Sequence, residues 1–459
     1  MPNNFPRLII AACMSGSGKT TLTVGLLAAL KNRGLNVQPY KVGPDYIDTG
    51  WHTVACGKIS HNLDTHLVGA DKLTEIFVDT ARGADISVVE GVMGLYDGGR
   101  GGISSTAEIS KLLTAPVVLV VDAKSMGTSA AAVALGFRQF DPTVNLAGVI
   151  VNRLGSDSHR DMIVDALNSV GIKIFGAIRR DDELRLPERH LGLVPTAEHC
   201  ADVEKICAAV ERQVDIDALI ELAETAPPLD DIPPAEKIPP TVRIAVARDA
   251  AFNFYYGAGL TALERLGAEI VCFSPLDDEH LPAAHGLIIG GGFPEMFAAR
   301  LEQNESLRAE INRAAEAGLP IFAECGGFMY LMRRLVDFSG KSFEMCGVID
   351  GVASMTDRLQ TVGYVDAEIL RDCVIGSAGD RLHAHEFHFS TADVVGEKIF
   401  RCQRLRTGHR YTAGVARGNV VASYLHVHLA GCPQVAASFV GACKKFSARQ
   451  SLKMSSPNA

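Results

Sequence analysis

Short apolar runs alternate with helical patterns along most of the chain. Each run is short enough for a buried strand, and the segments between them repeat their apolar positions at the helical period. This alternation is typical of parallel sheets that helices cover on both faces. We assign strands to residues 8–12, 86–89, 117–121, 147–151, 242–247, 269–273, 286–289 and 319–323. The pattern therefore predicts an α/β fold.

A proline-rich stretch interrupts this alternation at residues 225–241. It holds three Pro-Pro pairs, so it cannot form a helix or an inner strand, and we interpret it as an extended linker. The sequence therefore predicts two α/β domains, at residues 1–224 and 242–446. Residues 447–459 are polar, and we expect them to fray as a flexible tail.

The composition narrows the class of protein. The chain has 459 residues, of which 47% are hydrophobic and 21% charged, as in soluble globular proteins. A net charge of −9 argues against nucleic acid as the main partner, and no apolar run reaches the length of a membrane span. The N-terminus lacks a signal-peptide pattern, and eleven scattered cysteines without a C-x-x-C pair fit a reducing compartment. We expect a cytoplasmic protein without structural zinc. Whether the protein forms a homodimer is left open.

Cys325 is the strongest candidate nucleophile. It follows a predicted strand, and Gly326, Gly327 and a helical pattern come directly after it. A cysteine at a strand-to-helix turn exposes its sulfur, and the helix N-terminus favours the thiolate. The glycines leave N–H groups available to an oxyanion. The alternative is a buried structural cysteine, which is our interpretation for most of the other ten.

A thiol nucleophile needs a base, and His426 and His428 end another strand-like run. Residues two apart on a strand share a face, so both could reach one site. A histidine at a strand end can accept the thiol proton, and we prefer His426. The alternative is a pair of surface histidines.

The N-terminal half begins with a phosphate-loop pattern. The strand at residues 8–12 leads into a Gly-rich turn and then a helix predicted over residues 20–32. Such loops bind ATP through consecutive N–H groups and a Lys, and a hydroxyl binds Mg²⁺. Cys13 occupies a position where the strict motif has Gly, and a plain Gly-rich turn is the alternative. The predicted ATP-binding residues are Gly16, Ser17, Gly18, Lys19, Thr20 and Thr21, with the Thr20 hydroxyl as a metal ligand.

Other strand ends in this half add polar groups. Glu90 ends the strand at residues 86–89 and is a candidate metal ligand, and Asp97 in the following Gly-rich loop is a candidate substrate contact. Asn152 ends another strand, and its amide suits an adenine edge of ATP. For Asp97, the alternative is a solvated loop carboxylate.

The segment at residues 40–52 is dense in polar and aromatic side chains and holds the only Trp. A Gly-Pro turn carries carboxylates and a Lys that would suit Mg²⁺, phosphate and substrate. We predict Asp45 as a metal ligand, and an ordinary surface loop is the alternative. The predicted substrate-binding residues are Lys41, Asp45, Tyr46, Asp48 and Asp97.

These motifs together resemble the cobyrinic acid a,c-diamide synthase family, in the cobyrinate and cobyric acid synthase group of glutamine amidotransferases. The resemblance covers residues 7 to about 445. It implies a dethiobiotin-synthetase-like P-loop domain, followed by a flavodoxin-like class I glutamine amidotransferase domain. The matching segments are residues 41–48, 90–97, 187–193, 290–295, 324–327 and 385–388.

The resemblance implies an activity for these residues. ATP, with Mg²⁺, would convert the a and c acetate carboxylates of cobyrinate to acyl phosphates in cobalamin biosynthesis. Cys325, with His426 as base, would release ammonia from L-glutamine, and the N–H groups of Gly292 and Gly326 would form the oxyanion hole. His428 departs from the class I pattern, in which many domains have Glu two residues after the His, so a Cys-His dyad is expected.

Two rival functions remain open after a zinc site is set aside. The His383–His388 segment holds three histidines and a glutamate, but the resemblance makes it a family motif rather than a zinc site. The substrate could be hydrogenobyrinate, a cobyric acid precursor or another tetrapyrrole, because the metal in the ring is not visible in the sequence. A P-loop regulatory ATPase with an inactive glutaminase domain is a rival from a different class.

Overall fold

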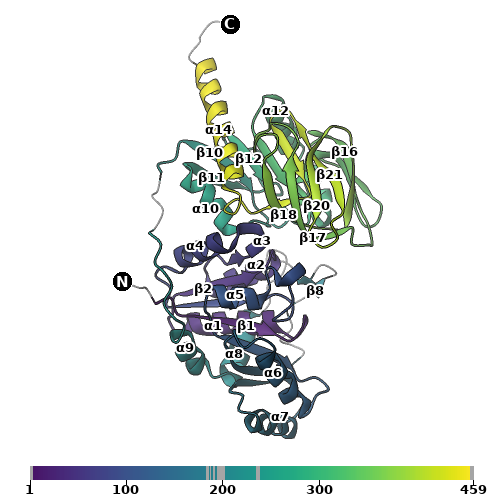
Figure 1. Cartoon of the computed structure of the whole chain (residues 1–459). Coiled ribbons are helices and arrows are strands. Elements are labelled where there is room, and N and C mark those ends of the chain that lie inside the picture. Colours follow the sequence, from purple (N-terminus) through teal and green to yellow (C-terminus); the bar gives the residue numbers. More distant parts are fainter. Residues whose placement is uncertain are drawn as a thin grey trace. The chain divides into compact units, whose positions relative to one another are not determined.

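Two compact units make up the chain, Met1–Pro234 and Ala235–Ala459. The computed structural model describes residues 4–181, 186, 188–189, 192–193, 202–233 and 238–454. The division between the units falls inside the proline-rich stretch. Each unit combines a sheet with helices, which confirms the predicted α/β fold class (Figure 1).

The first unit is built on a seven-stranded parallel sheet in the order β3-β2-β4-β1-β5-β6-β7. All six residues of the central strand β1 are buried, as the unbroken apolar run predicts. The strands are β1 (Arg7–Ala12), β2 (Val37–Val42), β3 (His61–Leu63), β4 (Ile86–Glu90), β5 (Val117–Asp122), β6 (Leu146–Leu154) and β7 (Ile174–Arg179).

Helices connect these strands. Gly25 on α1 allows α8 to pack closely, because a Cβ there would lie 2.5 Å from the Val210 side chain. A small antiparallel pair, β8 (Glu188–Arg189) and β9 (Gly192–Leu193), is separate from the main sheet. The helices are α1 (Lys19–Asn32), α2 (Ile47–Cys56), α3 (Thr65–Val68), α4 (Ala70–Ala81), η1 (Arg100–Gly102), α5 (Thr106–Leu112), α6 (Ser129–Phe140), α7 (Asp157–Ser169), α8 (Val203–Gln213) and α9 (Ile216–Glu224).

The second unit contains a ten-stranded mixed sheet in the order β11-β10-β12-β13-β22-β21-β20-β17-β18-β23. Its first five strands are parallel, and the antiparallel strands continue from β22. The strands are β10 (Val242–Ala247), β11 (Ala268–Phe273), β12 (Gly286–Ile289), β13 (Ile321–Glu324), β17 (Thr361–Ile369), β18 (Arg381–His388), β20 (Lys398–Arg404), β21 (Arg410–Arg417), β22 (Val420–Ser423) and β23 (His426–Val427).

A second, four-stranded sheet in this unit has the order β15-β14-β16-β19. The apolar pattern predicted only the parallel half of the ten-stranded sheet, because the remaining strands of the unit mix buried and exposed positions. The four strands are β14 (Met332–Val336), β15 (Ser342–Glu344), β16 (Ile349–Met355) and β19 (Ser390–Val394), and the helices of the unit are α10 (Gly257–Arg265), η3 (Pro294–Phe297), α11 (Ala298–Gln303), α12 (Glu305–Glu316), α13 (Gly326–Leu331) and α14 (Pro433–Met454).

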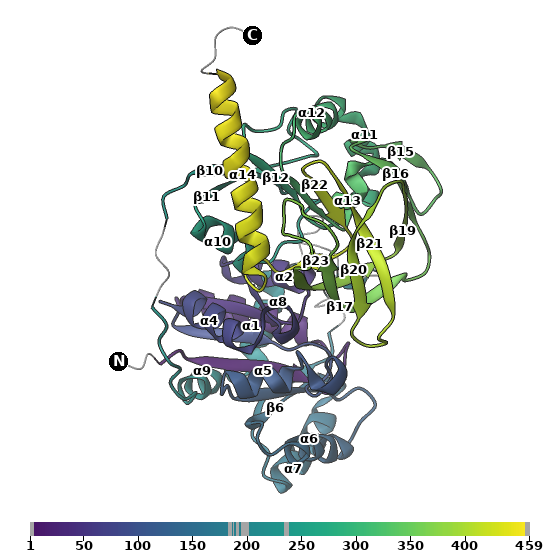
Figure 2. The same ribbon diagram turned by 45° about the horizontal axis from the view of Figure 1, so that its top comes forward.

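The C-terminal segment differs from its prediction. We expected a flexible tail from residue 447, but α14 continues to Met454 as one long helix (Figure 2). Phe439 and Val440, on the first half of α14, are buried in the core of the unit, so this half of the helix packs against the rest of the unit. None of the helices in the described part of the chain combines the length and the apolar character of a membrane span.

Candidate active site

The phosphate loop joins β1 to α1, as the sequence predicts. Gly16 and Gly18 have φ values of 76° and 87°, which favour glycine, and Gly18 is the residue before the first turn of α1. The Lys19 Nζ donates to the Met93 carbonyl at 2.7 Å. Burial lowers the pKa of Lys19 to about 8, and nearby Lys41 adds to that shift. The loop therefore presents N–H groups and a cation at the end of β1.

Asn152 at the end of β6 contacts this loop directly. Its Nδ2 donates to the Ser17 carbonyl at 2.9 Å, and its Oδ1 accepts from the Arg153 N–H at 2.9 Å. A Cβ on Gly18 would lie 2.5 Å from the same Nδ2. The amide therefore contacts the phosphate loop, and its contact with an adenine edge stays a prediction.

Three oxygen ligands converge beside the loop. The Thr20 hydroxyl donates to Glu90 Oε1 at 2.7 Å and lies 3.3 Å from Asp48 Oδ2. Lys41 Nζ lies between the same two carboxylate oxygens, at 2.6 Å from Asp48 and 2.8 Å from Glu90. A hydroxyl and two carboxylates are the hard oxygen donors that Mg²⁺ prefers, so these residues fit the ion.

The ionisation of the two carboxylates differs. Burial raises the pKa of Asp48 to about 7, and Asp45 adds to the shift while Lys41 opposes it. Burial would also raise the pKa of Glu90, but Lys41 and His52 together hold it well below its usual range. Glu90 is therefore the permanent anion of the cluster, and Asp48 would ionise fully only beside a second cation in addition to Lys41.

His52 is a part of this cluster that the sequence did not reveal. It is fully buried on α2, with Nε2 at 2.6 Å from Glu90 Oε2 and Nδ1 at 3.2 Å from Ser60 Oγ. The ring therefore orients the Glu90 carboxylate from the side opposite Thr20 and Lys41. A lone histidine in a helical pattern carries no signal that distinguishes this role from ordinary packing.

Asp45 contacts the start of α2, and its role as a metal ligand stays a prediction. Its Oδ1 accepts from the N–H groups of Ile47 and Asp48, each at 2.8 Å, so it caps the start of α2. Asp48, rather than Asp45, lies within hydrogen-bond distance of Thr20. Tyr46, beside it, is the residue before the first turn of α2.

A cavity of about 610 Å³ opens at this cluster. Five of its described lining residues are Lys or Arg and three are Asp or Glu, so the lining carries an excess of positive charge suited to a polyphosphate. The described lining residues are Ser15, Gly16, Gly18, Lys19, Thr20, Thr21, Lys41, Asp45, Ile47, Asp48, Glu90, Val92, Met93, Lys124, Arg153, Arg180 and Leu186.

Sequence reasoning missed three of these cations, Lys124, Arg153 and Arg180. Arg153 has a φ of 63° and pairs with Asp122 at 2.6 Å, which fixes its direction at the end of β6. Asp97, a predicted substrate contact, is exposed outside this lining, and its Oδ2 accepts from the Gly94 N–H at 3.1 Å.

In the second unit, Cys325 occupies the turn between β13 and α13. Its φ of 47° and ψ of −102° are strained for a non-glycine residue, and its N–H donates to the Ser423 carbonyl at 2.8 Å. Burial raises the pKa of the thiol well above its usual range, and Glu295 raises it further. The helix N-terminus therefore does not produce a thiolate by itself, and the thiol needs a base.

Glycines bring the neighbouring loop against this turn. A Cβ on Gly326 would lie 3.0 Å from the Gly292 nitrogen, and a Cβ on Gly292 would lie 2.0 Å from the Ala251 carbonyl. A Cβ on Gly327 would lie 2.1 Å from the Ile289 carbonyl. The backbones of Gly292 and Gly326 are therefore adjacent, as an oxyanion hole requires.

His426 lies on β23, against the same glycine loop. A Cβ on Gly291 would lie 2.6 Å from His426 Cε1. Burial lowers the pKa of His426 to about 3, and His385 and His388 add to the shift. The imidazole is neutral at neutral pH and can accept a proton. The His428 ring stacks on Tyr256 at a centroid distance of 4.6 Å.

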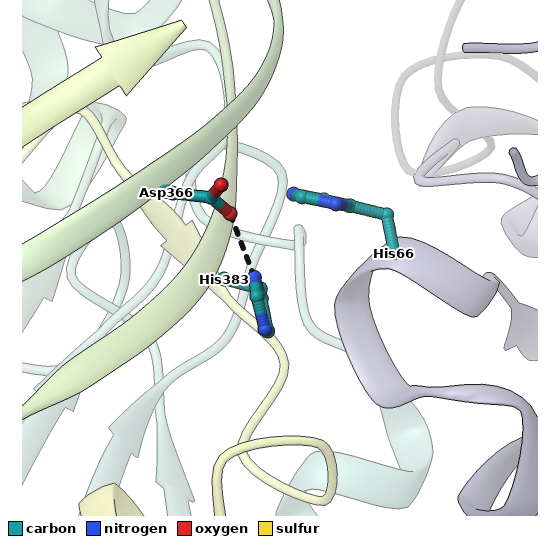
Figure 3. A group of neighbouring side chains, drawn as sticks. All are labelled: His66, Asp366 and His383. Atoms are coloured by element: carbon teal, nitrogen blue, oxygen red, sulfur yellow. Dashed lines mark hydrogen bonds and ion pairs between the residues drawn. The ribbon is translucent and has the colours of Figure 1, made fainter. Parts of the chain in front are cut away.

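The histidine-rich segment on β18 makes several separate contacts. His383 Nδ1 lies 2.8 Å from Asp366 Oδ1 on the paired strand β17 (Figure 3). Glu386 accepts a hydrogen bond from the Tyr411 hydroxyl. The His388 ring stacks on the Tyr424 ring at a centroid distance of 3.8 Å. Of the motif at residues 187–193, residues 187, 190 and 191 lie outside the described part of the chain.

Two family models match the chain. Residues 8–194 match the CobQ/CobB/MinD/ParA nucleotide binding domain, and residues 243–433 match the CobB/CobQ-like glutamine amidotransferase domain. The matches cover the phosphate loop and Glu90 in the first unit, and Cys325 and His426 in the second. They support nucleotide binding and glutamine amidotransferase chemistry as the functions of the two halves.

Curated relatives match over almost their whole length. The chain is 43% identical to the hydrogenobyrinate a,c-diamide synthase of Streptomyces coelicolor, over 96% of this chain and 98% of that protein. It is 42% identical to the cobyrinate a,c-diamide synthases of Caldanaerobacter subterraneus and Salmonella typhimurium, in each case over 95% of this chain and 98% of the relative. The chain belongs to the cobyrinate and hydrogenobyrinate a,c-diamide synthase family.

Proposed function

We propose that the protein amidates the a and c acetate carboxylates of cobyrinate, using ATP and L-glutamine, as a step in cobalamin biosynthesis. We infer the corrin substrate from the relatives of the chain, most of which are cobyrinate a,c-diamide synthases. The observation that carries the proposal is that one chain holds two sets of suitable residues. One set lines a cationic pocket, and the other places the turn of Cys325 and the ring of His426 against one glycine loop.

The first unit activates the carboxylate. A carboxylate does not react with ammonia because its oxygen is a poor leaving group. In the proposed reaction a carboxylate oxygen attacks the γ-phosphorus of ATP, ADP leaves, and an acyl phosphate forms. Lys19 and the phosphate loop hold the triphosphate. Thr20, Asp48 and Glu90 would hold Mg²⁺, which when bound offsets negative charge on the phosphates.

The second unit releases ammonia. His426 takes the thiol proton, and the Cys325 sulfur attacks the glutamine amide carbon while the Gly292 and Gly326 N–H groups stabilise the oxyanion. The C–N bond breaks, the proton on His426 passes to the leaving nitrogen, and ammonia departs. Water then hydrolyses the thioester to glutamate. Ammonia attacks the acyl phosphate carbon, and phosphate leaves as the amide forms.

Mass spectrometry of the reaction products tests the proposal. The protein is incubated with ATP, Mg²⁺ and glutamine, and with cobyrinate or hydrogenobyrinate in parallel. We expect two successive amidations of cobyrinate, with ADP released only when corrin is present. Amidation of hydrogenobyrinate alone would show that the substrate is the metal-free ring. ADP release that is independent of any corrin, without amidation, would favour the regulatory ATPase instead.

Light scattering on the same preparation tests the homodimer, which stays a prediction.

A further inference from the structure

Glu324, the last residue of β13, links the nucleophile strand to the histidine strand. Its Oε1 accepts a hydrogen bond from the Val427 N–H at 2.8 Å, and both residues are buried. Glu324 directly precedes Cys325, and Val427 directly follows His426. We propose that Glu324 is a positioning residue that holds the His426 strand in place beside Cys325. The inference rests on the proposed glutaminase function of the second unit.

The histidine strand depends on this contact because it is short. β23 consists of His426 and Val427 and is the last strand in the order of its sheet, and among the described strands it pairs with β18 alone. The chain reaches it from β22, whose final residue Ser423 pairs with Glu324. The Glu324 side chain therefore supplies to the Val427 N–H the hydrogen bond that a further strand would supply inside a sheet.

Many class I domains have Glu two residues after the histidine base, but this chain has His428 there. The His428 ring stacks on Tyr256 at an interplanar angle of 19°. The Glu324 contact acts instead on the backbone next to His426. It connects the base to the residue that precedes the nucleophile, so it can set the separation between the two.

The surroundings of Glu324 suit a hydrogen-bond acceptor more than a fixed charge. Burial raises the pKa of its carboxyl to about 8, so the group is largely neutral at neutral pH. A neutral carboxyl still accepts from Val427 through its carbonyl oxygen. It also avoids a full negative charge next to Cys325, which would oppose thiolate formation. An amide of the same shape should therefore replace it.

The test compares Glu324→Gln with Glu324→Leu. Glutamine keeps an acceptor oxygen at the same reach, and leucine removes it at similar volume. We expect Glu324→Gln to keep glutaminase kcat within about threefold of wild type. We expect Glu324→Leu to lose roughly 10- to 100-fold in kcat, with KM for glutamine within about twofold, because the base rather than the substrate is displaced.

Two controls separate this role from general damage. Ammonia-driven amidation should stay near the wild-type rate in both variants, because it does not use Cys325. The matched control is Glu310→Leu on α12, because Glu310 also accepts a backbone hydrogen bond, from Leu281 at 2.8 Å. It should keep wild-type glutaminase activity.

The outcomes are distinct. Wild-type glutaminase activity in Glu324→Leu would overturn the positioning role while leaving the proposed function intact. Loss of activity in Glu324→Gln equal to that in a folded Glu324→Leu would also overturn it, because the acceptor is retained. If Glu324→Leu does not fold, the Gln variant still decides, since it must remain active. Absence of glutaminase activity in the wild type would instead contradict the proposed function itself.

Discussion

Two opposing local effects set the reactivity of Cys325. The strained turn and the adjacent N–H groups favour attack and oxyanion binding, whereas burial keeps the thiol protonated. In the proposed mechanism the thiolate therefore forms during the reaction, with the neutral His426 as the acceptor. The sequence predicted the residue and its turn, but it could not show how strongly the second unit desolvates the sulfur.

Cys325→Ala should abolish glutamine-driven amidation and leave ammonia-driven amidation largely intact. The thiol serves only ammonia release, so the glutaminase rate should fall by roughly a thousandfold or more. The measurement is glutamate release and corrin amidation with each nitrogen source. Cys346→Ala, which removes another buried thiol of the same unit, is the matched control and should behave as wild type. Normal glutamine hydrolysis in Cys325→Ala would exclude the assignment.

Asp48→Asn and Asp45→Asn should differ in their effect on carboxylate activation. Asp48 shares the cluster of Thr20, Lys41 and Glu90, so its loss should slow ammonia-driven amidation by roughly 2–4 kcal/mol of barrier. Asn at position 45 can still accept from the two N–H groups that start α2, so its effect should be smaller. Rates from both variants with saturating ammonia decide the order. A larger loss for Asp45→Asn would return the metal ligand to the residue predicted from sequence.

The raised pKa of Glu324 predicts a pH-dependent stability. A carboxyl with a folded pKa of about 8 stabilises the fold fully below its unfolded pKa, and this contribution is lost as the pH rises toward 8. Gln does not titrate, so Glu324→Gln should gain stability relative to wild type between pH 5 and pH 8. Thermal unfolding of both proteins at the two pH values measures the difference. A constant difference would mean that the carboxyl ionises normally.

At the scale of elements, the order of β1, the phosphate loop and α1 agrees closely with the sequence. The helix expected at residues 20–32 is α1, Lys19–Asn32. Buried parallel strands give continuous apolar runs, which is why they could be predicted. The strands from β14 to β21, most of which pair antiparallel, mix exposed and buried positions and contain many polar residues, so no equivalent signal existed for them.

The polar residues of the first site were only partly predictable for a related reason. Asp45 and Asp48 are both plausible ligands by residue type, and only the path of α2 shows which one meets Thr20. His52, Lys124 and Arg180 come from positions without a motif. Their roles depend on which loops the parallel sheet brings together at one edge, and spacing along the chain does not contain that information.

Asn152→Ala should weaken nucleotide binding through the phosphate loop. The lost hydrogen bond to the Ser17 carbonyl is worth about 0.5–1.5 kcal/mol, so affinity should fall by up to roughly tenfold. Because the loop binds phosphates, ATP and GTP should weaken by the same factor. Titration of the variant and the wild type with both nucleotides provides the measurement. A loss confined to ATP would show that the amide reads the adenine edge.

At the scale of the whole molecule, the proposed function divides into one half-reaction for each unit. In this proposal the first unit makes the acyl phosphate, and the second unit makes the ammonia. Each site is assembled from residues of its own unit, so variants in one should leave the intrinsic chemistry of the other unchanged. This separation underlies the comparison of nitrogen sources for Cys325 and Asp48.

The most direct test of the central claim follows the amide nitrogen. The wild-type protein is incubated with cobyrinate, ATP, Mg²⁺ and glutamine carrying ¹⁵N in its side-chain amide. From the proposed function we predict a cobyrinate diamide labelled at both new amides, with one ADP released for each amide formed. The Cys325→Ala protein should give no labelled product, yet should form unlabelled diamide when ammonia is supplied. Release of ADP and glutamate from the wild type while the corrin stays unamidated would contradict the proposed amidation of cobyrinate.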